Sequence, residues 1–258
     1  MGQFLITSKI NQLEAHLRLC EEFGVAIEFN DFFEPDLLDN KDGLIQVMDS
    51  YVNAGIPKNS TMHGVFFDIS IASADERIRR VSCERMKSSM EIARQLGLRA
   101  VVFHANYNSM LKSEVFDRNF VIRTVDFLKE LLITYPETEI YVENMFEHDT
   151  HILRAIAEEL SEYDNFGLCL DWSHAVIFGG GAKEWVEELH PYIRHLHIND
   201  NDLHNDLHLA VGSGEINWSE FKDYYSRFFS NCSVLVETEN PVNQRMSLEF
   251  LRNLEVLV

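Results

Sequence analysis

Short apolar runs alternate with longer amphipathic segments along almost the whole chain, and this alternation constrains the fold more than any other feature of the sequence. Eight runs are predicted to be β-strands: Phe4–Thr7, Val25–Phe29, Ser60–His63, Ala100–His104, Glu139–Glu143, Phe166–Asp171, Ile193–Ile198 and Val234–Glu237. Their nearly continuous apolar character is typical of parallel strands that are buried on both faces. Eight such strands with helices between them predict an α/β protein, a closed (β/α)8 TIM barrel.

Three of the intervening segments have a clear helical period. The longest, Ala74–Leu96, is followed by Gly97, a residue that often ends a helix, and Asn119–Ile133 and His151–Leu160 repeat the pattern. The apolar positions of the first segment are Ile78, Val81, Met86, Met90, Ile92, Ala93 and Leu96. With only 12 Gly and 5 Pro among 258 residues, the chain has no linker-like stretch, so residues 1–258 are expected to form one domain.

The charge balance argues against a nucleic-acid-binding protein. The chain has 42 acidic and 22 basic residues, a formal net charge of −20, and this field repels phosphate backbones and anionic lipids. The four cysteines, Cys20, Cys83, Cys169 and Cys232, are scattered, which fits a reducing compartment. Since the sequence also shows no targeting segment and no apolar run long enough to cross a bilayer, we expect a soluble, cytoplasmic protein.

Acidic and histidine side chains stand where the predicted strands end. The carboxyl ends of the strands of a parallel barrel meet at one mouth, so these side chains are expected to converge there. Imidazoles and carboxylates are ligands for Zn, Mn, Fe or Co. The predicted ligands are His63, His104, Glu143, Asp171, His174, His197, Asp206, His208 and Glu237.

Each of these residues has an ordinary structural explanation when it is taken alone. Asp171 followed by His174 is consistent with a helix N-cap beside a surface histidine, and Asp206 and His208 lie in a loop that is polar throughout. Together, however, unpaired carboxylates in one mouth would repel each other, and a multivalent cation relieves that repulsion. The set therefore predicts a metal site with one to three divalent ions, Zn or Mn.

Several motifs resemble the xylose-isomerase-like TIM barrels, the superfamily of endonuclease IV and of sugar-phosphate isomerases and epimerases. The matching segments are Thr61-Met-His-Gly, Val102-Phe-His-Ala-Asn, Tyr141-Val-Glu-Asn, Leu168-Cys-Leu-Asp-Trp-Ser-His, His195-Leu-His-Ile-Asn-Asp, the stretch from Asp206 to Trp218, and Val236-Glu-Thr. The resemblance extends from about Ser60 onward. The first fifty-odd residues match only as generic β/α units.

Two branches of this superfamily imply different chemistry. The epimerase branch implies one metal held by Glu143, Asp171, His197 and Glu237, with the two glutamates moving a proton beside a metal-polarised carbonyl and His174 orienting the sugar. The endonuclease IV branch implies three metals. Its first ion would lie on His63, His104 and Glu143, its second on the four ligands of the epimerase site, and its third on His174, Asp206 and His208.

The residues around the strand ends favour a small carbohydrate over DNA. Lys9, Lys112 and Arg194 are isolated, and no Arg or Lys follows His63 or His104 closely, so the contacts that hold a duplex backbone are missing. The same scarcity argues against a phosphate clamp, although the backbone of Gly179–Gly181 or Gly212–Gly214 is an alternative anion site. The aromatic residues Phe66, Phe67, Tyr107, Phe146, Trp172 and Trp218 are candidates for a sugar-pocket wall.

Three hypotheses follow for the function. The first is a metal-dependent isomerase or epimerase of a sugar or sugar phosphate, with catalytic Glu143, Glu237 and His174 and with Trp172 and His174 in substrate contact. The second is an endonuclease IV-like multi-zinc phosphodiesterase, and the third is a non-catalytic binding barrel, which leaves the acid and histidine set without a purpose. The expected partner is a small carbohydrate, not nucleic acid or a membrane, and a homo-oligomer is compatible with the sequence.

Overall fold

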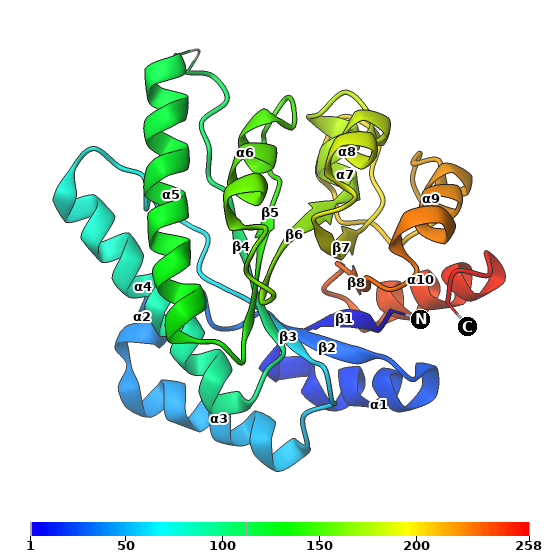
Figure 1. Cartoon of the computed structure of the whole chain (residues 1–258). Coiled ribbons are helices and arrows are strands. Elements are labelled where there is room, and N and C mark those ends of the chain that lie inside the picture. The colour runs from blue at the N-terminus through cyan, green and yellow to red at the C-terminus, as the bar shows by residue number, and fades with distance from the viewer. Residues whose placement is uncertain (1, 112, 258) are drawn as a thin grey trace.

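The computed structural model, which describes residues 2–111 and 113–257, is a closed barrel of eight parallel strands surrounded by helices (Figure 1). Neighbouring strands pair in sequence order, and β8 pairs with β1 to close the barrel. The strands are β1 (Phe4–Ser8), β2 (Ala26–Phe29), β3 (Thr61–His63), β4 (Ala100–His104), β5 (Glu139–Glu143), β6 (Phe166–Asp171), β7 (Ile193–Ile198) and β8 (Ser233–Val236). The predicted fold class is confirmed.

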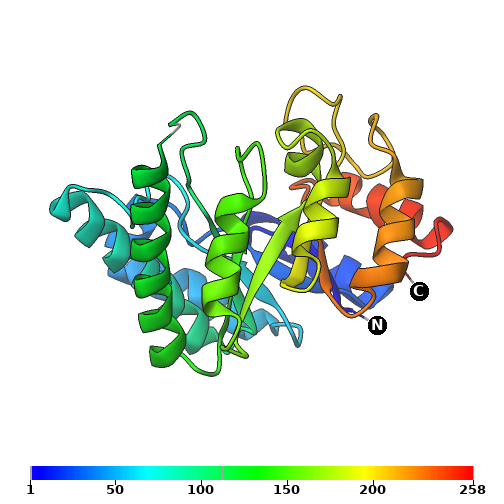
Figure 2. The same cartoon turned by 45° about the horizontal axis from the view of Figure 1, so that its top comes forward.

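Helices cover the outside of the barrel, as the two views of Figures 1 and 2 show. They are α1 (Leu13–Phe23), α2 (Pro35–Asp39), α3 (Lys41–Ala54), α4 (Glu76–Leu96), α5 (Glu114–Thr134), α6 (His151–Leu160), α7 (Trp172–Ile177), α8 (Ala182–Leu189), α9 (Trp218–Tyr224) and α10 (Pro241–Asn253). A short 3-10 helix, η1 (Ile10–Gln12), precedes α1, and a π-helical turn, η2 (Tyr225–Phe229), extends α9. None of the described helices is long and apolar enough to cross a membrane.

The predicted strands and helices match the observed ones closely, and capping residues explain the main differences. Helix α5 begins at Glu114, five residues before the prediction, because the Ser113 hydroxyl accepts a hydrogen bond from the backbone N–H of Phe116. Asp75 caps α4 in the same way. Strand β8 ends at Val236, so Glu237 is the first residue of the following loop.

The predicted apolar face of α4 is buried only in its second half. Met86 and Met90 pack in the core, whereas Ile78 and Val81 are 50% and 51% exposed. The physical reason is length, because a 21-residue helix rises about 31 Å and the strands β3 and β4 beside it have only three and five residues. The first turns of α4 therefore stand away from the barrel (Figure 1).

The interior of the barrel is apolar along most of the strands and polar at their carboxyl ends, and this places the site at the carboxyl ends. Small apolar clusters fill it on the inner faces of the strands, apart from the main core between strands and helices. They consist of Leu5, Ala26 and Leu235, and of Ala100, Val102, Tyr141 and Cys169. Because successive inward positions are two residues apart, His104, Glu143 and Asp171 continue these rows at the carboxyl ends of β4, β5 and β6. The mouth of the barrel is therefore polar.

Candidate metal centre

Strand register brings the predicted ligands together in pairs. His104 on β4 lies beside Glu143 on β5, and Asp171 on β6 lies beside His197 on β7. All four are inward-facing residues at the same end of the barrel. The convergence expected from strand ends is therefore present in the fold.

The first set of candidate ligands is His63, His104 and Glu143. The Nε2 atoms of the two histidines are 3.1 Å apart, and they lie 3.5 and 3.6 Å from Oε2 of Glu143. These are separations that ligands around one ion have, since an ion about 2.0–2.2 Å from each atom fits between them.

The second set shares Glu143 and adds Asp171, His197 and Glu237. Nδ1 of His197 is 3.2 Å from Oε1 of Glu143 and 3.7 Å from Oε2 of Glu237. One ligand atom from each of the four residues lies within 4.8 Å of the others, and Glu237 is the least buried of them. Glu143 therefore belongs to both sets and is the residue around which the centre is built.

The third set, His174, Asp206 and His208, depends on the loop between β7 and α9. Oδ2 of Asp206 is 3.3 Å from Nε2 of His174 and 3.1 Å from Nε2 of His208. His208 has a φ of 48°, which a histidine adopts rarely, so the loop holds this side chain in a particular direction at some conformational cost. Asp206 contacts both histidines and so connects the three residues of this set.

A buried aspartate keeps that loop in place. The carboxylate of Asp200 accepts hydrogen bonds from the backbone N–H of Gly212 at 2.9 Å and from the indole N–H of Trp218 at 2.8 Å. Asp200 also forms two backbone hydrogen bonds with Leu209. The Gly212 N–H is thereby used within the loop, and the Gly181 N–H binds the Ala175 carbonyl, so these glycines are turn residues rather than an anion cradle.

Hydrogen bonds to the other ring nitrogen orient several of these histidines. Nδ1 of His63 faces the Gly64 carbonyl at 3.0 Å, Nδ1 of His174 faces that of Asn144 at 2.9 Å, and Nδ1 of His208 faces that of Glu237 at 3.0 Å. A carbonyl only accepts, so each Nδ1 carries a proton, and Nε2 is the ring atom that faces the other candidate ligands and is available to a metal ion. Metal-binding histidines are commonly held in this way.

Burial and neighbouring charges shift the pKa values of the carboxylates in this cluster. Burial raises the pKa of Asp171 to about 8, and the neighbouring carboxylates of Glu237 and Glu143 act in the same direction. Burial also opposes ionisation of Glu143, but the combined effect of His197, His104 and His63 outweighs it and holds the pKa of that carboxyl well below its usual range. A bound divalent ion would stabilise all the carboxylates in their ionised form.

Unpaired buried atoms test whether the residues fit such an ion. Both carboxylate oxygens of Glu143, Oδ2 of Asp171, Oε2 of Glu237 and Nδ1 of His197, the ring nitrogen that faces these carboxylates, are buried and have no hydrogen-bond partner. A buried polar atom without a hydrogen-bond partner destabilises the folded state, and such atoms are rare in folded proteins. Because these unpaired atoms are ligand atoms of one set, the residues fit a divalent metal.

Two residues that contact the candidate ligands, Glu28 and Asn144, were not predicted as site residues from the sequence. Glu28 on β2 lies beneath the ligands, 3.3 Å from Nε2 of His197 and 3.3 Å from Nε2 of His195. Asn144 donates to the Asp171 carbonyl and accepts from its backbone N–H. The only sequence signal for Glu28 is a charged residue between Ile27 and Phe29 in a buried strand, where an unpaired carboxylate is costly.

A cavity of about 400 Å³ opens above the ligands. Its lining residues are Asn30, His63, Phe66, Phe67, Asp68, His104, Asn106, Met145, Phe146, His174, Asp206, His208, Glu237 and Glu239. Three of the predicted aromatic wall residues, Phe66, Phe67 and Phe146, are among them. Of the second ligand set, Glu237 reaches the cavity and Glu143 lies beneath it.

The two tryptophans proposed for the wall are elsewhere. Trp172 is only 1% exposed and packs against the rings of Phe221 and Tyr224 in the helical layer. Trp218 is buried with its N–H on Asp200. Trp172 points outward because it follows the inward-facing Asp171, so its placement does not support the predicted sugar contact.

The basic residues considered from the sequence do not reach the ligands. Lys9 forms an ion pair with Glu239 at the rim of the cavity. Arg194 is the second residue of β7, at the amino end of the barrel, and donates to the Asp164 carbonyl. Lys112 lies outside the described residues.

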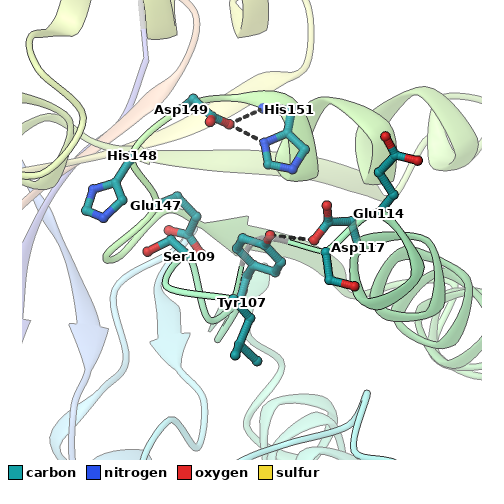
Figure 3. A pocket seen from close by; sticks show the side chains of 10 residues that line it. Tyr107, Ser109, Glu114, Asp117, Glu147, His148, Asp149 and His151 are labelled. Carbon is teal, nitrogen blue, oxygen red and sulfur yellow. Dashed lines mark hydrogen bonds and ion pairs between the residues drawn. The ribbon is translucent and has the colours of Figure 1, made fainter.

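A second cavity of about 260 Å³ lies beside the start of α5 and the loop after β5 (Figure 3). Tyr107 donates to Asp117 at 2.6 Å, Asp149 pairs with His151, and Glu147 accepts from the backbone N–H of Met145. These contacts hold the two loops and are separate from the ligand sets. Tyr107 therefore lines this cavity and not the one above the ligands.

The sequence and the structure both match known proteins. The family model described as "xylose isomerase-like TIM barrel" matches residues 17–254, and the chain belongs to this family. An uncharacterized protein of Methanocaldococcus jannaschii, MJ1311, is 30% identical over 204 residues, 74% of this chain and 68% of that protein. Apurinic-apyrimidinic endonuclease 1 of Plasmodium berghei is 24% identical over 204 residues, which cover 70% of this chain and 39% of that protein.

Solved structures share the fold at low sequence identity. The TTHB071 protein of Thermus thermophilus, from a crystal soaked with ZnCl2, superposes with a TM-score of 0.79 at 21% identity over 98% of this chain and 97% of that one. A D-tagatose 3-epimerase-like protein superposes with a TM-score of 0.78 at 23% identity over 99% and 98% of the two chains. The predicted superfamily is confirmed.

Replacement of Asp171 by Asn is expected to weaken metal binding before it affects anything else. A neutral amide is a poorer ligand than a carboxylate, and we expect a loss of affinity of at least about tenfold. The fold should persist, because Asp171 also caps α7 by accepting from the His174 N–H and Asn caps equally well. Competition with a chromogenic chelator measures the affinity. Exposed Asp223→Asn is the control, and equal affinities in both variants would remove Asp171 from the ligand set.

Proposed function

We propose that the protein is a metal-dependent isomerase or epimerase of a small carbohydrate. A divalent ion, Zn or Mn, held by Glu143, Asp171, His197 and Glu237 would supply Lewis-acid polarisation of a substrate carbonyl. The cavity above these ligands has a volume of about 400 Å³, within the roughly 300–1,000 Å³ of small-molecule sites. The family of the chain and the geometry of the ligands both support this proposal.

The composition of the cavity wall carries the proposal. Among the described residues that line it there is no Lys or Arg, while Asn30, Asn106, Asp68 and Glu239 offer groups that hydrogen-bond to hydroxyls. A phosphate would meet carboxylates here, whereas a neutral sugar would find both donors and acceptors. Phe66 and Phe146 supply apolar surface for the carbon face of a ring. An unphosphorylated sugar is therefore the substrate that this wall favours.

The different positions of Glu237 and Glu143 support different roles in proton transfer. Glu237 lines the cavity, so we assign one of its carboxylate oxygens to the proton on the carbon beside the carbonyl and the other, the buried Oε2, to the metal. Glu143 lies beneath, and we assign it first to metal ligation and second to proton transfer on the opposite side. His174 presents Nε2 at the cavity and is assigned to orient a substrate oxygen.

Solvent exchange tests the chemistry on a panel of sugars, so the substrate need not be identified first. The protein, loaded with Mn²⁺ or Zn²⁺, is incubated with free ketoses and aldoses in D2O, and proton NMR follows deuterium at the carbon beside the carbonyl. We expect enzyme-dependent exchange with at least one free sugar and little with its phosphate ester. If no sugar in a broad panel exchanges while metal is bound, the isomerase proposal is wrong.

One observation favours a second candidate, an endonuclease IV-like phosphodiesterase. All nine predicted ligands lie in one mouth, and the first and third sets exceed what a one-metal enzyme needs. Clustered metals suit the cleavage of phosphodiesters. The metal content per chain separates the two: about one ion favours the isomerase, and about three favour the hydrolase.

A further inference from the structure

Glu28 is a carboxylate enclosed within the barrel. It is 1% exposed and points inward from β2, below the level of Glu143. Oε2 accepts a hydrogen bond from the hydroxyl of Thr61 at 2.6 Å and lies 3.3 Å from Nε2 of His195, while Oε1 lies 3.3 Å from Nε2 of His197. Three polar side chains from two other strands therefore surround one carboxylate.

A buried carboxylate lowers the stability of the fold unless its partners compensate for the lost hydration. Transferring a carboxylate from water into a protein interior carries a large loss of hydration that its partners must offset, and well-packed apolar residues often serve stability as well. The inward positions nearby, such as Ala26 and Leu235, show that this barrel accepts apolar residues in its interior. A role in folding alone gives no reason for the charge at this position.

The contacts of His197 indicate a role for the charge of Glu28. This ring spans two carboxylates, with Nε2 toward Glu28 and Nδ1 toward Glu143, 3.2 Å away, and Glu237. A neutral imidazole has one proton and one lone pair. If Nε2–H faces the ionised Glu28, the lone pair of Nδ1 faces the proposed metal ligands.

Glu28 is itself held by its neighbours. Thr61 lies beside it in the register of β2 and β3, and His195 is fixed by a contact of 2.7 Å between its Nδ1 and the Ser233 hydroxyl. His195 and His197 are two residues apart on β7, so both point into the barrel. The carboxylate therefore has a defined position relative to the metal centre.

We propose that Glu28 is a positioning residue of the metal centre, which accepts the Nε2 proton of His197 and so makes Nδ1 the ligand atom. This inference rests on the metal binding in the proposed function and adds a residue outside the predicted ligand set. Carboxylates that orient metal-binding histidines in this way raise metal affinity by about 10–100-fold.

Cys169 raises an alternative for the same residues. Its thiol, His195 and His197 bring ligand atoms within 4.8 Å of one another, as a buried thiolate metal site would. Both histidines, however, turn Nε2 toward a carboxylate, and burial raises the pKa of the Cys169 thiol well above its usual value. The distances favour the contacts with Glu28, and the experiment below separates the two arrangements.

The test compares Glu28→Gln with the native protein and with Glu139→Gln. Gln keeps the size of Glu28 but removes its charge. Glu139 is a matched control, a glutamate on β5 that binds Arg99 and Tyr141 at the other end of the barrel. Zn²⁺ affinity is measured by chelator competition, the ligand field by the visible spectrum of the Co²⁺ protein, and folding by circular dichroism.

We expect Glu28→Gln to fold, to lose about 10–100-fold in Zn²⁺ affinity and to show altered Co²⁺ bands, while Glu139→Gln behaves as the native protein. Unchanged affinity and spectrum in Glu28→Gln would overturn the inference and leave the proposed function intact. A native protein that takes up no metal would overturn both. A strong near-ultraviolet thiolate-to-cobalt band would put the ion on Cys169 and contradict the positioning role.

If Glu28→Gln does not fold, Thr61→Val provides the test. Valine has the shape of threonine but cannot donate to Glu28, so the carboxylate loses one of its three partners. We expect a smaller, several-fold loss of Zn²⁺ affinity with the same direction of change in the Co²⁺ spectrum. Native affinity in a folded Thr61→Val protein would then count against Glu28 as a positioning residue.

Discussion

Replacement of Glu237 by Gln is expected to lower turnover by about 10²–10⁴-fold while the barrel still folds. Glu237 lies just after β8 and lines the cavity, so an amide of the same size removes the proposed base without disturbing packing. The measurement is kcat with metal at saturating concentration, with circular dichroism as the check on folding. Exposed Glu249→Gln on α10 is the matched control and should leave kcat unchanged.

Glu143→Gln is expected to abolish turnover for a related reason, since its carboxylate belongs to both of the tightest ligand sets. The two variants should differ in metal content. Glu143→Gln loses metal as well as activity, whereas Glu237→Gln retains a measurable part of its metal binding. If either variant keeps nearly native activity with metal saturating, the mechanism with two glutamates is wrong.

The barrel and the convergence of most of the candidate ligands could be predicted because both follow from local sequence. A buried parallel strand is a short apolar run, and the last inward residue of each run is the next position in a period of two. His63, His104, Glu143 and Asp171 end four successive strands, so the fold alone gathers them. Neither the helices nor the loops need to be known for this step.

Residues whose role depends on a side-chain direction or on a distant partner could not be predicted in the same way. Trp172 lies between two ligands in the sequence, yet its neighbour Asp171 faces inward and Trp172 faces the helices. Glu28 looks like a single charge in an apolar run until Thr61, His195 and His197 are placed around it. The role of Glu28 depends on its contacts with side chains of other strands, which the pattern within one strand does not reveal.

The third ligand set shows a further limit. Asp206 and His208 reach the mouth because Asp200 ties down the loop after β7 through Gly212 and Trp218, contacts that span up to 18 residues. Composition alone describes this segment as a polar loop. Its ordered path depends on hydrogen bonds that a periodic pattern does not reveal.

Duplex DNA with an abasic site is expected to bind weakly, and incision at moderate salt is expected to be inefficient even with Zn²⁺ or Mn²⁺ supplied. The affinity of proteins for duplexes comes largely from Lys and Arg contacts that release counterions. This chain carries a net charge of −20, and among the described residues that line the cavity none is Lys or Arg. Lys9, which directly follows β1, is paired with Glu239, one of the residues that line the cavity.

The measurement is a direct comparison under one set of conditions. Metal-loaded protein is mixed with an abasic duplex at low and moderate salt, and binding and nicking are followed together with deuterium exchange on free sugars. Attraction to DNA would have to come from the bound ions, because the carboxylates around the cavity repel the backbone. A neutral sugar meets no such repulsion, and the same carboxylates accept its hydroxyls. Efficient metal-dependent incision by pure protein would reverse this ranking, since it would show that the nine ligands outweigh the charge of the whole chain.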